Sequence, residues 1–99
     1  MKSHRYRVTL EHLAGKNADE TLHAPLQFEC SNHDDIFSII DRAAAARLFE
    51  GDENTAFLVG LKLFSETMLT HRDDPLFAPL QGAFGEFMKG LKARTKPAI

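Results

Sequence analysis

Two stretches near the start of the chain alternate between apolar and polar side chains. They span residues 4–13 and 21–30, and the polar stretch 14–20 between them contains Gly15 and Asn17, which favour a turn. Apolar side chains at every second position are typical of a strand with one buried face. The apolar positions are Tyr6, Val8, Leu10, Leu22, Ala24, Leu26, Phe28 and Cys30. The pattern predicts an antiparallel hairpin of two strands, 4–13 and 21–30.

The register of this hairpin follows from which side chains must share a face. A slip by one residue would turn the apolar positions toward water, whereas a shift by two residues keeps both faces and stays open. The favoured register pairs Tyr6 with Phe28, Val8 with Leu26, Leu10 with Ala24, Arg5 with Glu29, and Glu11 with His23. Pro25 has no amide hydrogen, so its backbone is expected to point away from the partner strand, which leaves the first strand as the open edge.

Helical periodicity begins after the second strand. Ser31 or Asn32 can cap a first helix, acidic residues follow in its first turn, and Gly51 is expected to end it. Its predicted buried positions are Ile36, Phe37, Ile39, Ile40, Ala43, Ala44 and Leu48. The pattern predicts a helix over residues 32–49.

A second helix, predicted over residues 54–70 with Asp52 or Asn54 as its cap, is the most apolar part of the chain. Its apolar positions are Phe57, Leu58, Leu61, Leu63, Phe64, Met68 and Leu69. Only the band that carries Val59, Lys62 and Glu66 is left for water. A helix this apolar needs neighbours on more than one side, so it is predicted to form the centre of the core.

A third helix is predicted over residues 75–93, because Asp74 and Pro75 suit the cap and the first helical position. Pro79 leaves open a later start, after a turn at residues 75–78. The apolar face consists of Phe77, Leu80, Phe84, Phe87, Met88 and Leu91, and Gly82, Gly85 and Gly90 lie off it. These glycines indicate a frayed or closely approached helix. Residues 94–99 carry no core pattern and are expected to form a mobile tail.

The order of elements predicts a single α+β domain over residues 1–99. An antiparallel β-hairpin is followed by three α-helices (ββααα), which are expected to pack on one face of the sheet. With 43% hydrophobic and 26% charged residues, the composition is that of a soluble globular domain. The single cysteine, Cys30, excludes an internal disulfide and fits a reducing compartment. No signal peptide or membrane span is recognisable, so the cytoplasm is the expected location.

Four segments of the chain resemble a small bacterial family known only as a domain of unknown function. They are HRYRVTLE at residues 4–11, SNHDDIF at 31–37, DDPLFAPL at 73–80 and FGEFMKGLK at 84–92. The resemblance covers nearly the whole chain and implies a compact α+β fold of bacterial origin. The segments contain strand alternation, helix caps and an apolar helical face, so the resemblance implies no activity and assigns no catalytic residue.

The open edge of the first strand predicts a homodimer. An isolated two-stranded hairpin is marginally stable, and an unpaired edge favours pairing with another strand. A twofold-related copy aligned antiparallel near Val8 or Thr9 places Arg5 or Arg7 opposite Glu11 of the second copy and gives a continuous four-stranded sheet. The alternative is that Arg5 and Arg7 are edge charges that prevent such pairing.

Three groups of side chains are candidates for a metal site or for acid–base chemistry. They are Cys30 with His33 and His23, Glu11 with His23, and His71 with Arg72, Asp73 and Asp74. The first group does not converge, because His23 falls on the opposite face of the hairpin from Cys30. The second is explained as a cross-strand pair, and the third as an exposed loop with a helix cap. No nucleotide-binding, serine-hydrolase or zinc-protease motif occurs. We therefore predict no catalytic, cofactor-binding or metal-binding residues and no enzymatic activity.

Nucleic-acid binding is the better-motivated alternative function. Two basic groups, Lys2, His4, Arg5 and Arg7 near the start and Lys89, Lys92, Arg94 and Lys96 near the end, would form a basic patch if they met. Against this, the net charge is -2, acidic residues share the hairpin, and no exposed aromatic platform is predicted. The preferred function is a non-enzymatic, homodimeric protein-interaction or structural module. A small enzyme or ligand-binding protein with a site of another kind is a second alternative.

Overall fold

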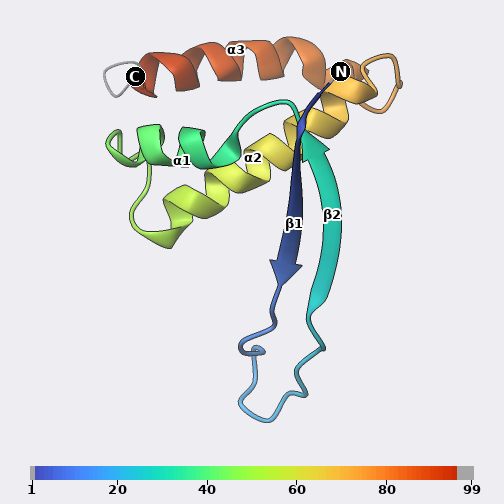
Figure 1. Ribbon diagram of the computed structural model, residues 1–99, viewed down its shortest axis with the longest axis vertical. Helices are drawn as coiled ribbons and strands as arrows, with labels where there is room; N and C mark the ends of the chain where they lie inside the picture. Colours follow the sequence, from blue (N-terminus) through green and yellow to red (C-terminus); the bar gives the residue numbers. More distant parts are fainter. Residues whose placement is uncertain (1, 96–99) are drawn as a thin grey trace. The chain divides into compact units, whose positions relative to one another are not determined.

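The computed structural model describes residues 2–95 and contains two strands followed by three helices. The elements are β1 (His4–Leu10), β2 (Leu26–Asn32), α1 (Ile36–Ala44), α2 (Asp52–Thr70) and α3 (Ala78–Thr95) (Figure 1). This order confirms the predicted ββααα fold of the α+β class. The chain divides into two compact units, which we call the hairpin unit (residues 1–33) and the helical unit (residues 34–99). A single domain with its helices on one face of the sheet stays a prediction.

β1 and β2 pair antiparallel in a register shifted by two residues from the favoured one. The pairs run from His4 with Asn32, through Tyr6 with Cys30, Arg7 with Glu29 and Val8 with Phe28, to Leu10 with Leu26. The shift keeps every side chain on its predicted face, so the hydrophobic pattern does not distinguish the two registers. Ion pairing does not distinguish them either, because Glu29 binds both Arg5 and Arg7.

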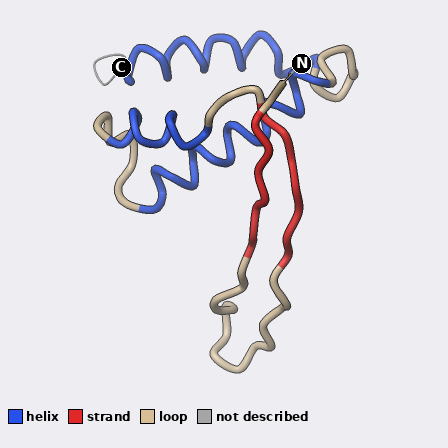
Figure 2. The backbone as a smooth tube through the Cα atoms, in the orientation of Figure 1, coloured by secondary structure: helices blue, strands red, loops and turns tan. Residues whose placement is uncertain are grey.

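Both strands are shorter than predicted, and residues 11–25 form a long irregular connection (Figure 2). In the observed register the next partner of Glu11 is Pro25, which has no amide hydrogen to donate to the ladder. In addition, the backbone amide of His23 donates to the side-chain Nδ1 of His12 at 2.9 Å. This amide therefore bonds a side chain in place of a carbonyl of the first strand. Pro25 lies outside β2, so the orientation of its backbone does not determine which strand carries the open edge, contrary to the prediction from the sequence.

α1 begins later than predicted. Ser31 and Asn32, the predicted caps, are the last residues of β2. Asp35 caps α1 instead, because its carboxylate accepts hydrogen bonds from the amide of Ser38 at 3.2 Å and from the Ser38 hydroxyl at 3.0 Å. Both bonds satisfy donors in the first turn, where a helix has no internal acceptors. The sequence predicts Asp35 in the first turn of the helix, whereas the structure places it at the cap.

α1 also ends earlier than predicted, at Ala44. Arg47 follows in a left-handed conformation, with a φ of 47°, which turns the chain away from the helix axis. Gly51, predicted to end the first helix, is the residue that precedes α2, and its φ of 59° and ψ of -136° suit glycine. The predicted cap Asn54 is buried, and its Oδ1 accepts a hydrogen bond from the amide of Phe49 at 3.2 Å.

α2 contacts both other helices, in agreement with its predicted central place within the helical unit. Residues of α1 lie close to residues of α2. The ring pairs between α2 and α3 are edge-to-face, with centroids 6.3 Å apart for Phe57 and Phe87 and 6.3 Å for Phe64 and Phe84, and Phe57 also lies 5.2 Å from Phe49 of the loop after α1. The buried apolar side chains of this unit are Ile36, Ala43, Leu58, Met68 and Phe77. The predicted arc of α1 is only partly buried, since Phe37 and Ala44 are exposed.

The predicted water-facing band of α2 is wrong. Val59, Lys62 and Glu66 are all half-buried. Lys62 Nζ lies 3.0 Å from Oδ2 of Asp34, and the two side chains are 17% and 31% exposed. The segment before α1 therefore covers part of this band, which a periodicity argument within one helix does not reveal.

α3 starts at Ala78, the later of the two starts that the sequence left open. Asp74 forms the preceding turn, since its Oδ1 accepts from the amide of Leu76 at 2.9 Å and its carbonyl accepts from Phe77 at 3.0 Å. The helix continues to Thr95, so the tail predicted from residue 94 is wrong for its first two residues, and residues 96–99 lie outside the described part. Apart from its chain neighbours and the nearby backbone of its own helix, a Cβ at Gly82, Gly85 or Gly90 would meet no described atom within 4 Å. Close approach within residues 2–95 therefore does not explain these glycines.

Candidate interaction surface

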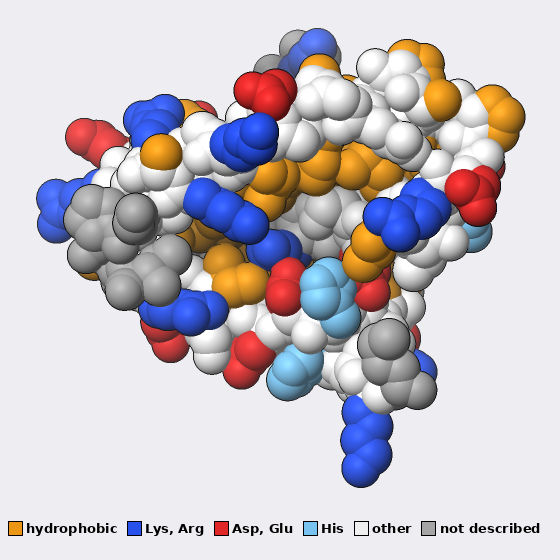
Figure 3. Space-filling model, turned by 90° about the horizontal axis from the view of Figure 1, so that it is seen from above, with side chains coloured by type: hydrophobic (Ala, Val, Ile, Leu, Met, Phe, Trp, Pro, Cys, Tyr) orange, Lys and Arg blue, Asp and Glu red, His pale blue; other side chains and the backbone are white. Residues whose placement is uncertain are grey.

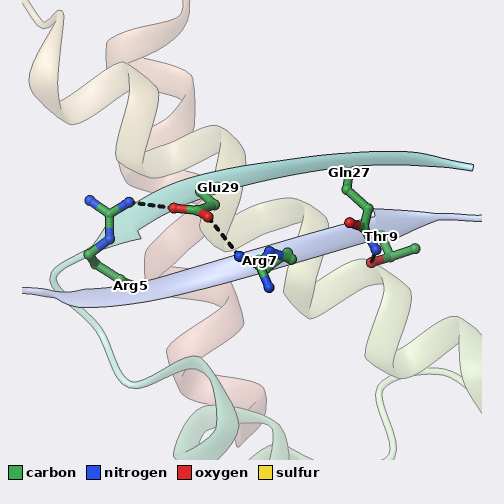
Figure 4. A network of polar contacts seen from close by, with 5 residues as sticks. All are labelled: Arg5, Arg7, Thr9, Gln27 and Glu29. Atoms are coloured by element: carbon green, nitrogen blue, oxygen red, sulfur yellow. Dashed lines mark hydrogen bonds and ion pairs between the residues drawn. The ribbon is translucent and has the colours of Figure 1, made fainter.

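One carboxylate organises the polar face of the hairpin. Glu29 accepts from Nη2 of Arg5 at 2.7 Å and from Nη2 of Arg7 at 2.9 Å (Figure 4). The hydrogen bond from Arg7, followed by the hydrogen bond and the charge of Arg5, holds the pKa of Glu29 below its ordinary value. Next along the sheet, Gln27 Nε2 donates to Thr9 Oγ1 at 3.2 Å. Two guanidinium groups share one carboxylate, so this cluster keeps a net positive charge.

The opposite face of the hairpin is apolar and largely exposed. Tyr6 and Val8 are half-buried. Four of the other predicted core positions have exposed fractions of 65% for Leu10, 47% for Leu22, 56% for Leu26 and 43% for Phe28, while Ala24 is also exposed and Cys30 is half-buried. The prediction that these four side chains are buried is wrong, because alternation identifies the apolar face of a strand and not what covers it. Leu22 lies in the irregular connection, whereas Leu10, Leu26 and Phe28 lie on the paired strands and form an exposed apolar face. Such a face is typical of a surface that associates with another molecule.

β1 has an unpaired backbone edge among the described residues. The sheet formed within residues 2–95 has two strands, so each strand is paired along one side only. The amide and carbonyl groups on the other side of β1 are a template for a further strand. Arg5, Arg7 and Thr9 lie on β1, whereas Glu11 follows its last residue. The edge predicted from the sequence is present, with Glu11 just beyond its end.

A hollow of about 640 Å³ lies at the loop end of the hairpin unit, between Leu10, Leu13 and Leu26. His12 and His23 also line it, and their rings are stacked with centroids 5.2 Å apart. Sequence reasoning predicted His23 beside Glu11 and missed this histidine pair. Both histidines lie in the irregular connection, where side-chain alternation carries no signal.

The candidate metal ligands are not brought together. Cys30 is half-buried on β2 opposite Tyr6, His33 follows the end of β2, and His23 stacks on His12. Among residues 2–95, no three His, Cys, Asp or Glu side chains are grouped closely enough to hold a metal ion. A zinc site requires at least three converging protein ligands, so these residues do not make one.

The acidic loop after α2 is held by structural hydrogen bonds. The amide of His71 donates to the carbonyl of Thr67 at 3.1 Å and closes α2. The carbonyl of Arg72 accepts from Gln81 Nε2 at 2.6 Å. Asp74 forms the turn that leads into α3, and the whole group is exposed. This arrangement offers a turn and a helix end, without the enclosed acid–base pair that catalysis needs.

The two basic groups considered for nucleic-acid binding lie on different units of the chain. In the hairpin unit, Arg5 and Arg7 both bind Glu29. In the helical unit, Lys89 lies 3.4 Å from Glu86, and Lys92 and Arg94 occupy the last turn of α3. Lys96 lies outside the described residues. Cations at the end of a helix also have a structural role, because they offset the negative end of the helix dipole.

No described helix has the length and apolar character needed to cross a membrane. This finding covers residues 2–95.

Comparison with known proteins gives one family and one solved structure. Residues 4–93 match a family model described as a domain of unknown function with a solved structure, DUF3861. A crystal structure of a protein of unknown function from Pectobacterium atrosepticum SCRI1043 is similar to this chain, with 34% sequence identity and a TM-score of 0.80. The match covers 93% of this chain and 99% of that one. No curated protein matches the chain significantly.

Proposed function

This chain belongs to the DUF3861 family, a domain of unknown function, and on that premise we propose a function from the chain's own surface. We propose a non-enzymatic protein-interaction module that forms a homodimer through the edge of β1. The observation that carries the proposal is the unpaired edge of β1 beside an exposed apolar hairpin face. Pairing of two β1 edges satisfies their backbone amide and carbonyl groups, whereas the exposed apolar face is left for association with another molecule.

The proposed dimer places two β1 strands antiparallel about a twofold axis at Val8. Residue numbers then pair symmetrically: Val8 meets its own copy, Tyr6 meets Leu10, and Arg7 meets Thr9. Just beyond the strand, Arg5 meets Glu11 of the second copy. The pair of the two Val8 residues occurs once and every other pair occurs twice, so the interface contains two opposite-charge pairs and a continuous strip of apolar side chains.

The arginines support this pairing in the register at Val8. A register centred on Arg7 would place two guanidinium groups directly opposite one another, and like charges in facing positions destabilise a sheet. The register at Val8 avoids that contact, because Arg7 faces the neutral Thr9. Glu29 binds both arginines within its own chain, which reduces the repulsion between copies.

The resulting four-stranded sheet has a wider apolar face than one hairpin has alone. We propose that this face takes part in binding another protein, with the cytoplasm as the site of action because Cys30 is a free thiol. Tyr6 and Phe28 are the aromatic side chains of this face, and aromatic residues are enriched in protein interfaces.

A charge exchange tests the dimer. Glu11→Arg places like charges opposite each other twice, and we expect a dimer dissociation constant about tenfold higher by sedimentation equilibrium. The double variant Arg5→Glu/Glu11→Arg restores opposite charges across the twofold axis and is expected to recover most of the loss. Asp19→Arg, an acid-to-base change in the connecting loop, serves as the matched control. Equal dissociation constants for all four proteins would contradict pairing in this register.

A further inference from the structure

The three helices of the helical unit enclose an apolar hollow of about 210 Å³. Each helix contributes two apolar side chains, which are Ile39 and Ala43 from α1, Leu58 and Leu61 from α2, and Met88 and Leu91 from α3. Leu58 is 2% exposed and Ala43 4% exposed, so the hollow extends to the best-buried part of the unit. It lies wholly within this unit and shares no residue with the edge of β1.

The border of the hollow is cationic. Each helix supplies one basic residue, Arg42, Lys62 and Lys92 respectively, and no Asp or Glu is among the described lining residues. Lys62 is bound to Asp34 at 3.0 Å. Arg42 and Lys92 form no ion pair with any residue of the described range. The chain as a whole has a net charge of -2, so this local excess of positive charge is not a general property of its surface.

The view from above shows hydrophobic side chains gathered in a depression, with Lys and Arg as well as Asp, Glu and His side chains along its border (Figure 3). Apolar walls with a few polar groups at the mouth are the usual composition of a small-molecule site. Two unpaired cations beside such walls favour a ligand that has an apolar body and an anionic end.

We propose that this hollow binds an unbranched medium-chain carboxylate. A cavity of about 150 Å³ accommodates benzene, so a hollow of this size suits a chain of about eight carbon atoms. The tail lies against Leu58 and Met88, and the unbranched Met88 side chain adapts to its shape. The carboxylate lies at the mouth, where Arg42 and Lys92 donate charge-assisted hydrogen bonds to it.

Titration calorimetry and amide chemical shifts with four probes test this assignment. Octanoate is expected to bind with a dissociation constant of about 1 mM or tighter and to shift the amides of the lining residues. Octanol, which has the tail without the charge, is expected to bind about tenfold more weakly. Octylammonium and acetate, which lack the anionic end and the tail respectively, are expected not to bind. Equal binding of octanoate and octylammonium, or no shifts with octanoate, would overturn the proposal.

Variants separate the two parts of the site. Arg42→Gln/Lys92→Gln is expected to weaken octanoate binding about tenfold and to leave octanol binding unchanged. Lys89→Gln is the control, because it removes one charge from α3 at a residue that does not line the hollow. This variant is expected to bind octanoate with unchanged affinity. Met88→Trp fills the hollow and is expected to abolish binding of both ligands, with circular dichroism to verify folding. Unchanged octanoate affinity in Arg42→Gln/Lys92→Gln would overturn the role of the cationic border, whether or not Met88→Trp folds.

Discussion

Arg7 on β1 lies directly opposite Glu29 on β2, with Nη2 of the arginine 2.9 Å from Oε2 of the carboxylate. Arg5, which faces Ser31, reaches the other carboxylate oxygen of Glu29 at 2.7 Å. One acidic side chain therefore connects two positions of the neighbouring strand. The side chain of Arg7 is 64% exposed and that of Glu29 is 50% exposed, so water and salt screen the interaction between them.

Removing the two arginines is expected to raise the pKa of Glu29. Their hydrogen bonds and charge favour the ionised carboxylate, so Arg5→Gln/Arg7→Gln brings the pKa back toward its ordinary value. Carboxyl carbon chemical shifts measured against pH give this pKa directly. Lys16→Gln, a charge change in the connecting loop, is the control, and a pKa that is equal in all three proteins would contradict the observed contacts.

The same pair gives the hairpin a pH dependence. The folded-state pKa of Glu29 lies below its unfolded value, so the stabilisation is present above the unfolded pKa and is lost as the pH falls through the folded pKa. Acidification below about pH 4 is expected to lower the free energy of unfolding more in the native chain than in Glu29→Gln. Urea unfolding at a series of pH values measures this, and parallel curves would contradict it.

Loss of Lys62 is expected to destabilise the helical unit by about 1–2 kcal/mol, because Asp34 then loses a charged partner in a half-buried position. Lys89→Ala provides the matched control, since Lys89 is 79% exposed and its pair with Glu86 is worth about 0.5 kcal/mol or less. Chemical unfolding of Lys62→Ala and Lys89→Ala compares the two. Equal effects would show that burial of the Lys62 pair has no energetic consequence.

Gly51→Ala is expected to cost about 1–3 kcal/mol, because a φ of 59° with a ψ of -136° is a backbone conformation that side chains disfavour. Gly60→Ala, inside α2 with no described atom within 4 Å of its Cβ position, is expected to stabilise the chain by about 1 kcal/mol. Thermal unfolding of both variants shows whether each substitution raises or lowers the stability of the chain. A stabilising Gly51→Ala would contradict the positive φ.

The element order was predictable from the sequence because each element carries its own periodicity. Alternation at Tyr6, Val8 and Leu10 identified a strand, and the apolar stripe around Leu58 and Met68 identified a helix. The register was not predictable, since a shift by two residues preserves both faces, and Glu29, which was expected to face Arg5, faces Arg7 and binds both arginines. Long-range contacts such as Lys62 with Asp34 leave no periodic signal in either segment.

The candidate surface was predictable in part. The sequence identified the edge that carries Arg5, Arg7 and Thr9, because alternation fixes which residues a strand contains. It did not identify the exposure of Leu10 and Leu26, because burial depends on neighbours outside the strand. The cationic hollow was also missed, since Arg42 and Lys92 are far apart along the chain and meet only when α1 and α3 lie against α2.

The molecular mass in solution tests the central claim most directly. Light scattering on the native chain across a range of concentrations is expected to give twice the 11.1 kDa mass of one chain, and Glu11→Arg is expected to move the dimer–monomer midpoint to higher concentration. A mass of one chain at every concentration would contradict the homodimer and, with it, the assignment of β1 as its interface.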